Sequence, residues 1–434
     1  LPLVSFTIPL VLGNLFQLTY NAADSVIVGK YVGEQALAAV GTSTPIMNIA
    51  ILLISGMCMG ASVLMSSQYG AKDYDTLSRQ ISTTMLAGCG FSVVFSLLML
   101  LLANPVLRLI RVPETAIPEA AAYLRIIFMG LIFTFMYNFL ANTMRALGDS
   151  KTPLYFLVTS AFLNIFGDLF FVVVLRWGVA GSAIATVCSE GLCCLLCGIY
   201  IKKKIPLLCL GKKWWVFDKS LLGKTVSYGS TSAMQQVCLQ LGKLIIQSVV
   251  NTQGVAVMAA FTAVNRVDDF AYTPQQNIGH AMTTFLAQNK GAGHKERMKK
   301  GFQTGLLIEL VYSVGLFCVI WGLAPQIMTL FAEDGDAQVV SLGISYLHLI
   351  SWMYILPGLT NGVQGFFRGI GDLKVTLYST FMNMFGRVVA VFVMIRLLQM
   401  EFASLAWANM VGWIVMLLFE VPLLVKSMRN GECG

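Results

Sequence analysis

The sequence predicts an all-α membrane protein, with 12 transmembrane helices in two six-helix halves around a central cavity. Three observations lead to this fold class: an apolar composition, apolar segments that recur along the whole chain, and an internal repeat. Of the 434 residues, 57% are hydrophobic and 12% are charged, against about 25% charged residues in an average protein. The mean hydropathy is +0.75. A soluble domain could not cover its surface with so few charges.

Twelve segments are long and apolar enough to span a bilayer, which takes about 20 residues in a helix. In chain order they are 3–29, 36–66, 78–104, 117–144, 152–175, 178–201, 221–250, 255–287, 302–323, 339–366, 375–398 and 402–425. The runs are long and lack strict apolar–polar alternation, so we predict helices rather than the strands of a β-barrel. The first segment is too long for a signal peptide and contains polar residues, so we count it as a helix.

The basic residues predict how the chain is oriented in the membrane. Lys and Arg concentrate in alternate loops, and the connection at 202–224 is the richest of them. Because cytoplasmic loops carry the excess of Lys and Arg, we expect a multi-pass protein of the plasma (inner) membrane with both termini in the cytoplasm. The net charge of +8 then belongs to the cytoplasmic face and requires no nucleic-acid partner.

The two halves are visible as an internal repeat. RALGDSKTPLY at 145–155 recurs as RGIGDLKVTLY at 368–378, an offset of 223 residues, and NIFGD at 164–168 recurs as NMFGR at 383–387. Six is an even number of helices, so both halves share one orientation, as in transporters with a site between parallel repeats; duplication without transport is the alternative. We predict an N-terminal lobe at 1–204, a cytoplasmic connecting loop at 205–224 and a C-terminal lobe at 225–434.

The repeated RxxGD turn has a structural explanation. The glycine is expected to end one helix, and the aspartate is expected to cap the next. A role in gating is the alternative for this turn.

Polar side chains follow one face of the first and seventh predicted helices. Spaced three or four residues apart, they are Asn14, Gln17, Asn21 and Asp24 in the first helix and Gln236, Gln240, Lys243 and Gln247 in the seventh. Such spacing keeps each set on one helix face. Polar groups within a membrane must meet each other or water. We therefore predict that both faces line a substrate cavity between the halves; polar contacts between tightly packed helices are the alternative.

Asp168 is a carboxylate inside an apolar run, where a charge costs about 2.5–3.5 kcal/mol on insertion scales. Asn164 lies four residues earlier, on the same helix face, and Asp24 lies on another helix of the same half. Two carboxylates in a pocket of low dielectric cannot both stay charged cheaply, which suits a proton acceptor. Asp24, Asn164 and Asp168 also offer oxygen ligands for Na⁺. The residue types leave both ions open, and a structural hydrogen-bonded pair is the third alternative.

The other polar residues within the predicted helices are less specific. Arg266 and Asp269, three residues apart with Asp268 beside them, are expected to neutralise each other. The roles of His280 and His348 stay open. Single glutamates are expected at helix ends or in packing contacts, and these are Glu190, Glu309 and Glu420. The ten cysteines lie mostly in apolar segments, which favours packing over disulfides or a metal site.

Pro9 lies inside the first segment, fifteen residues before Asp24, and a proline permits a helix to kink. This spacing, NIFGD, GVAGSAIAT at 178–186 and the GDSKTPLY loop occur in the order typical of one family. Over essentially its whole length the chain resembles the multidrug and toxic compound extrusion (MATE) family, closer to its DinF-like branch. The resemblance implies a proton or cation site of Asp24, Asn164, Asp168 and Thr186, with Pro9 as the hinge.

The sequence departs from the NorM-like branch of that family, which places carboxylates on helices 7 and 10 of the second half. Here helix 7 offers Gln residues and Lys243, and helix 10 offers His348. A second coupling site at those positions is therefore not expected.

These observations predict a secondary active exporter of amphipathic, cationic compounds, working by antiport with H⁺ or Na⁺ and needing no other cofactor. Its partners would be small-molecule substrates and the lipid bilayer, and we expect a monomer. The first alternative is a flippase for lipids or lipid-linked oligosaccharides, whose anionic headgroup would favour a cluster of cations in the cavity. A membrane-embedded enzyme or a receptor is less favoured, because neither a nucleophile–base set nor a large extramembrane domain is evident.

Overall fold

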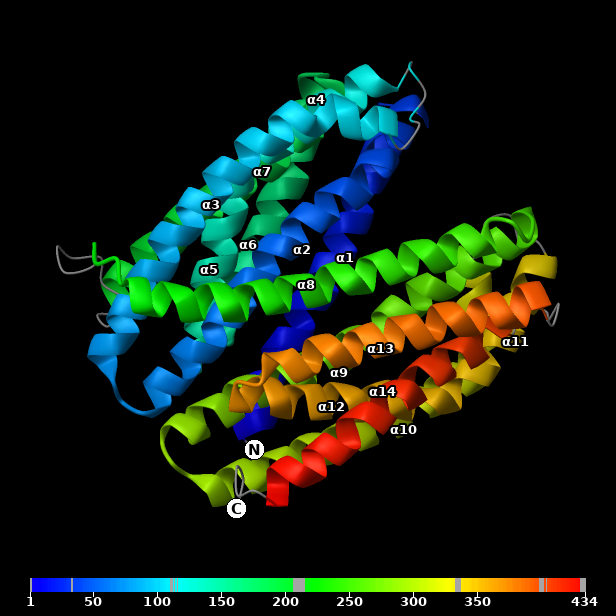
Figure 1. Ribbon diagram of the computed structural model, residues 1–434. Coiled ribbons are helices and arrows are strands. Elements are labelled where there is room, and N and C mark those ends of the chain that lie inside the picture. Colours follow the sequence, from blue (N-terminus) through cyan, green and yellow to red (C-terminus); the bar gives the residue numbers. More distant parts are fainter. Residues whose placement is uncertain are drawn as a thin grey trace. The chain divides into compact units, whose positions relative to one another are not determined.

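The computed structural model describes residues 2–32, 34–109, 112, 114, 116–205, 215–331, 337–397, 402 and 404–429. Over these residues the chain is almost entirely helical and contains no strand (Figure 1). This confirms the all-α fold class. Each of the 12 predicted segments coincides with one helix or with consecutive helical pieces.

The first six predicted spans correspond to eight helical pieces. They are α1 (Pro2–Tyr31), α2 (Glu34–Gly70), α3 (Tyr74–Leu109), α4 (Ile117–Met129), α5 (Leu131–Ala146), α6 (Lys151–Asp168), the π-helical η1 (Leu169–Val174) and α7 (Gly178–Lys204). Helices α4 and α5 meet at an angle of 47°. Gly130 lies at this bend, and a Cβ there would lie 2.4 Å from Val187 Cγ2 of α7. The bend therefore brings the bare backbone of Gly130 against α7.

The last six predicted spans correspond to nine helical pieces. They are α8 (Lys219–Val250), α9 (Val255–Gly291), α10 (Lys295–Phe331), α11 (Ala337–Ser351), the 3₁₀ turn η5 (Trp352–Tyr354), α12 (Ile355–Ile370), α13 (Leu373–Phe392), the π-helical η6 (Val393–Leu397) and α14 (Ser404–Arg429). The turn η5 interrupts the span formed by α11 and α12. At such a turn the backbone carbonyls are available to side chains of neighbouring helices.

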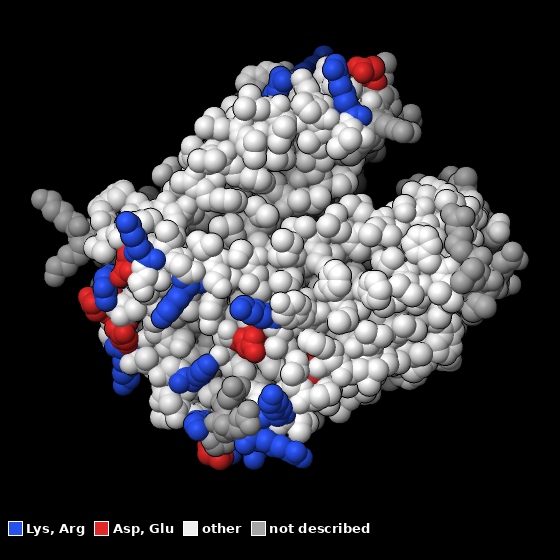
Figure 2. Space-filling view, viewed as in Figure 1, with Lys and Arg blue, Asp and Glu red and all other residues white. Residues whose placement is uncertain are grey.

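The surface is suited to lipid. Among the described residues, eight helices are long and apolar enough to cross a bilayer, or nine when α4 and α5 count as one bent span. Polar and charged side chains lower the hydropathy of α8 and α9, and the apolar part of α1 is the shorter Leu3–Thr19. Figure 2 shows wide areas without any charged side chain on the visible face. This is a multi-pass membrane protein.

The chain folds as two compact units, Ile8–Ala233 and Met234–Gly434, and Leu1–Thr7 groups with the second. The division falls within α8. Residues 206–214 of the predicted connecting loop lie outside the described residues, whereas 219–224 are helical. Asp218 caps the start of α8, because its Oδ1 accepts the N–H of Ser220 at 2.9 Å and of Leu221 at 3.3 Å.

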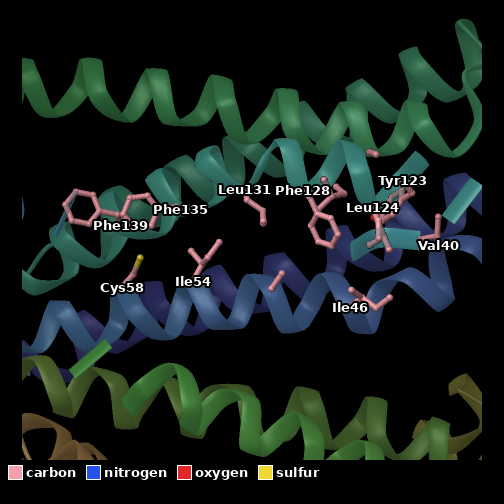
Figure 3. Close-up of a cluster of buried hydrophobic side chains, with 14 of the residues drawn as sticks. Val40, Ile46, Ile54, Cys58, Tyr123, Leu124, Phe128, Leu131, Phe135 and Phe139 are labelled. Atoms are coloured by element: carbon pink, nitrogen blue, oxygen red, sulfur yellow. The ribbon is translucent and has the colours of Figure 1, made fainter. Parts of the chain in front are cut away.

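Each unit has its own apolar core. In the N-terminal unit, α2 presents side chains such as Ile54 toward Phe128 and Leu131 of α4 and α5 (Figure 3). In the C-terminal unit, residues of α9, α10, α11, α13 and α14 form a second cluster that includes the fully buried Tyr346 and Tyr354. Two separate cores agree with the two predicted halves.

The repeated RxxGD turn uses its glycine in both halves. Gly148 and Gly371 have φ angles of +92° and +86°, a region that favours glycine and ends a helix. In the first half, Asp149 Oδ1 accepts the N–H of Lys151 at 3.1 Å and of Thr152 at 3.0 Å. In the second half, Asp372 makes no side-chain cap. The predicted aspartate cap is therefore present in the first half only.

Candidate functional site

The N-terminal unit buries a polar group between α6 and α7. Asn164 and Asp168, one turn apart on α6, are 3% and 0% exposed. Asn164 Nδ2 donates a hydrogen bond to Thr186 Oγ1 of α7 at 3.2 Å, and this hydroxyl donates to the carbonyl of Ser182 at 3.2 Å. The structure thus joins Asn164 to Thr186, with Asp168 one turn further along α6.

The close approach of α6 and α7 depends on Gly167, the neighbour of Asp168. A Cβ at Gly167 would lie 2.9 Å from Ala185 Cβ, closer than side chains normally approach. Directly after Asp168 the helix changes from α to π, and Leu175 N–H bonds to the carbonyl of Phe170. Such π-bulges occur frequently at functional sites. Asp168 therefore lies at a tight helix contact where the backbone geometry changes.

The predicted residues of α1 are placed only in part. Pro9 lies inside α1 and is buried, Asn14 is half-buried and Gln17 is exposed. The side chains of Asn21 and Asp24 lie outside the described residues, although their backbone belongs to α1. The predicted pairing of Asp24 with Asp168 stays a prediction.

The polar face of α8 is partly accessible. Its predicted residues Gln236, Gln240 and Gln247 are half-buried, and Lys243 is exposed. Lys243 Nζ lies 3.4 Å from Asp269 Oδ1 of α9. The expected partner of Asp269 was Arg266, and this is wrong: no ion pair joins those two in the described part of the chain. Lys243 reaches Asp269 from the adjacent helix, and Arg266 extends into an exposed position.

Sequence reasoning missed Gln235, which lies next to the predicted stripe and is buried. Its Nε2 donates to Gln364 Oε1 of α12 at 3.2 Å and to Thr380 Oγ1 of α13 at 2.9 Å. Arg368 Nη2 donates to the same Gln364 oxygen at 2.6 Å. A spacing of three and four selects one helix face, so a buried glutamine on the adjacent face was not recognised.

A second buried carboxylate lies in the C-terminal unit. Asp268 of α9 is 4% exposed. It accepts hydrogen bonds from the phenol groups of Tyr354 at 2.5 Å and Tyr346 at 3.1 Å, and Asn409 Nδ2 of α14 donates to Tyr346 Oη at 2.9 Å. Arg387 of α13 interacts electrostatically with Asp268. Asn409 lies 223 residues after Thr186, so the repeat offset was a signal that could have found this cluster.

Two of the three single glutamates are buried within helices, and Glu190 is half-buried. Glu309 and Glu420 are 1% and 0% exposed and lie well inside α10 and α14 rather than at helix ends. Glu190 accepts a hydrogen bond from Thr134 Oγ1 at 2.5 Å. Of the two histidines left open, His280 contacts Arg368 through Nδ1 at 3.4 Å, and the ring of His348 packs on Trp321.

The sequence profile of the MatE family matches this chain twice, at residues 9–170 and 232–393. The two matches begin 223 residues apart, which is the offset of the internal repeat. This chain belongs to the MatE family. Members of the family are ion-coupled membrane transporters and not enzymes, so the resemblance stated from the sequence motifs is confirmed. The identity of the ion does not follow from membership.

Several bacterial relatives of this MatE protein carry names that refer to drug resistance. The probable multidrug resistance protein YpnP of Bacillus subtilis (strain 168) is 32% identical over 86% of this chain and 83% of its own length. The probable multidrug resistance protein YoeA of the same strain is 29% identical over 88% and 82%. The probable multidrug resistance protein NorM of Thermotoga maritima is 23% identical over 95% and 89%.

Solved structures confirm the fold. A multidrug resistance MATE transporter of the MOP superfamily in an outward-facing conformation superposes with a TM-score of 0.92 at 22% identity, covering 100% of this chain and 96% of that one. A MOP superfamily transporter from Pyrococcus furiosus superposes with a TM-score of 0.92 at 21% identity, covering 99% and 96%. At this identity the likeness establishes the two-lobe, 12-helix MatE fold alone.

Proposed function

We propose that this protein is a secondary active multidrug exporter of the plasma (inner) membrane, which expels amphipathic, cationic compounds by antiport with H⁺ or Na⁺. Membership of the MatE family and the names of its relatives support export of drugs. The observation that carries the coupling is the complete burial of Asp168 beside the Asn164–Thr186 hydrogen bond. A carboxylate in that position requires a proton or a cation for part of the cycle.

Asp24 is the proposed partner of Asp168. Helix α1 approaches α6 at Gly13, where a Cβ would lie 3.3 Å from Leu157 Cδ2. Asp24 and Asp168 lie equally far beyond that contact, about 16 Å along each helix axis. As the first and fifth spans, α1 and α6 cross the membrane in the same direction. The two positions therefore lie at matching distances along their helices, and Pro9 is the proposed hinge before Asp24.

The proposed coupling between substrate and ion follows from the positive charge that both carry. With a cationic substrate bound from the inside, the two carboxylates are free to be ionised; after release outside, H⁺ or Na⁺ takes the place of the substrate charge. Exchange of one monovalent cation for one monovalent drug moves no net charge. Exchange of two would also draw on the membrane potential, worth about 2.3 kcal/mol per charge per 100 mV.

The polar faces of α1 and α8 are the proposed substrate cavity, comprising Asn14, Gln17, Asn21, Gln236, Gln240, Lys243 and Gln247. The ion pair between Lys243 and Asp269 supports cationic substrates over anionic lipids, because it neutralises the one cation of the α8 stripe. A flippase for lipid-linked oligosaccharides would instead need that cation unpaired, to bind the anionic headgroup.

The test is transport by the purified full chain in proteoliposomes, with a pH gradient and a Na⁺ gradient imposed separately. The probe is tetraphenylphosphonium, a cation without a titratable group. We expect uphill movement under one of the two gradients, and its loss when an ionophore collapses that gradient. Uphill movement under neither gradient, together with translocation of a pyrophosphate-linked lipid, would replace the exporter by the flippase.

A further inference from the structure

Glu309 of α10 is a buried carboxyl group that the proposed coupling site does not use. It is 1% exposed, and within the described part of the chain neither of its carboxyl oxygens has a hydrogen-bond partner. Nor does any Lys, Arg or His there form an ion pair with it. An isolated carboxylate in such surroundings is far costlier than the neutral acid. The burial of Glu309 therefore requires a proton.

A candidate hydrogen-bond acceptor for that proton is Gln275, since Gln275 Nε2 and Glu309 Oε2 both approach Gly358. Gln275 of α9 is 0% exposed, and its Nε2 donates to Ser313 Oγ at 3.1 Å and to the Tyr354 carbonyl at 2.8 Å. Its Oε1 is buried and has no donor among the described residues. A protonated carboxyl group has one O–H to donate. A proton on Glu309 is therefore a candidate donor to the unpartnered oxygen of Gln275.

The interrupted span of α11 and α12 provides the space for this group. A Cβ at Gly358 of α12 would lie 2.9 Å from Ser313 Oγ, 3.2 Å from Gln275 Nε2 and 3.4 Å from Glu309 Oε2. The Tyr354 carbonyl, at the end of the turn η5, accepts the hydrogen bonds from Gln275 and Ser313. Helices α9, α10 and α12 thus enclose this polar cluster beside Gly358. The turn η5 leaves the Tyr354 carbonyl available to it.

The titratable neighbours do not supply a counter-charge. On α10 itself, Tyr312 interacts electrostatically with Glu309 and donates to the Ala271 carbonyl. On α9, Asp268 is engaged with Tyr354 of η5 and Tyr346 of α11. Among the other titratable groups on the elements packed against α10, Arg368 of α12 contacts His280 of α9, and His348 of α11 packs on Trp321. On α9, Lys290 donates to the Ile370 carbonyl, Tyr272 packs on Tyr354 and Trp413, and Arg266 is exposed.

We propose that Glu309 is a second proton-binding site of this transporter, located in the C-terminal unit, and that it exchanges its proton during the transport cycle. This inference rests on the proposed H⁺ antiport. On release, the O–H bond of the acid breaks and the proton passes to water. The amide of Gln275, turned by half a rotation, then presents its N–H to the carboxylate. Asp268 accepts hydrogen bonds from two phenol groups and is not the proposed proton carrier of this unit.

Infrared spectroscopy of the reconstituted full chain tests whether Glu309 holds a proton at neutral pH. Glu309→Gln replaces the acid by an amide of the same shape, and we expect the C=O absorption of about one protonated carboxyl group to disappear. Asp268→Asn is the matched control and should leave that absorption in place. Retention of the full absorption in the Glu309→Gln protein would overturn the site.

Proton release on substrate binding tests the exchange. With tetraphenylphosphonium added to weakly buffered detergent-solubilised protein, Glu309→Gln should release about one proton fewer than wild type. Unchanged release would make the Glu309 proton a permanent structural one and refute the exchange. If wild type released none at all, the proposed H⁺ antiport would fail, while the infrared result would still decide the protonation of Glu309.

A third variant, at the proposed acceptor, tests the site even if the Glu309→Gln protein does not fold. Gln275→Met removes the proposed acceptor and leaves Glu309 in place. The carboxyl C=O absorption should then shift to higher frequency, because the O–H group loses its hydrogen bond. An unshifted absorption would exclude the pairing of Glu309 with Gln275.

Discussion

Asn164 and Thr186 are joined across the α6–α7 interface by a 3.2 Å hydrogen bond from Nδ2 to Oγ1. The bond fixes the orientation of the amide one turn before Asp168, and Gly167 lets the two helices approach closely enough to form it. The proposed coupling site is therefore built on a rigid helix pair rather than on loops. The predictions below test the site and the geometry that supports it.

Asp168→Asn should abolish gradient-driven export and retain substrate binding. The amide is permanently neutral, so it can neither take up nor release the coupling ion, and removal of a buried charge favours insertion. Asp24→Asn should behave alike. Uphill efflux in proteoliposomes at matched protein levels is the measurement, and Asp75→Asn, at a carboxylate 87% exposed, is the control with wild-type transport. Wild-type uphill transport by both the Asp168→Asn and the Asp24→Asn variants would reduce these carboxylates to structural groups.

Thr186→Ala should weaken ion coupling without abolishing it. The substitution removes one neutral oxygen and the partner of Asn164, a hydrogen bond worth about 1 kcal/mol, or roughly fivefold in the ion concentration at half-maximal transport. Thr186→Ser keeps the hydroxyl and should restore the wild-type dependence. The ion dependence of the initial efflux rate is the quantity to measure. Equal behaviour of the alanine and serine variants would show that the hydroxyl takes no part.

Gly167→Val should destabilise the N-terminal unit. The new side chain meets Ala185 of α7, and overpacking of this kind costs about 1–3 kcal/mol. Gly198 of α7 has open space where its Cβ would stand, so Gly198→Val is the matched helical control. The midpoint of thermal unfolding in detergent should be lower for Gly167→Val than for Gly198→Val. Equal midpoints would mean that α6 and α7 separate at no cost.

Lys243→Gln should improve, or at least preserve, binding of monocationic substrates. Lys243 and Asp269 are 53% and 45% exposed, so their ion pair adds only about 0–1 kcal/mol to stability. Without the lysine, Asp269 keeps its negative charge for the substrate, whereas Asp269→Asn should weaken binding. Equilibrium binding of tetraphenylphosphonium compares the two variants. Loss of anionic-lipid movement alone in Lys243→Gln would instead favour the flippase.

The membrane orientation predicts opposite labelling of two exposed positions. Lys203 lies at the end of α7, within the connection proposed to be cytoplasmic, and Trp177 lies in the turn on the other side. In a background without the native cysteines, a membrane-impermeant maleimide applied to intact cells should label Trp177→Cys and spare Lys203→Cys until the cells are opened. The reverse pattern would invert the topology.

The sequence sufficed for the fold because length and hydropathy are local properties of a segment. The described residues of the 12 predicted spans are almost all helical, and the repeat offset of 223 residues recurs in the two family matches. Local pattern did not reveal the bend at Gly130, the π-turn after Asp168 or the capping of α8 by Asp218. Each of these depends on a neighbouring helix or on a single side-chain hydrogen bond rather than on an apolar run.

The candidate site was predictable to the extent that its residues carry recognisable motifs. Asn164, Asp168 and Thr186 were named from the sequence, and the structure shows Asn164 bonded to Thr186. Asp268 was named without a functional role, because its partners lie on other helices and up to 86 residues away. The pairing of Arg266 with Asp269 was wrong, since helical spacing permits several partners and Lys243 of α8 competes.

The sequence by itself determined a membrane-embedded, twofold-repeated helical transporter with carboxylates in its N-terminal half. Bilayer insertion and helix formation respond to composition and spacing, both of which can be read along a single chain. Only the tertiary structure decided which polar groups come together: the half-exposed Lys243 with Asp269, two tyrosines with the buried Asp268, and Gln275 with Glu309 around Gly358. Hydrogen bonds and charges act over a few ångströms in space, and helix packing, not distance along the chain, determines which side chains come that close.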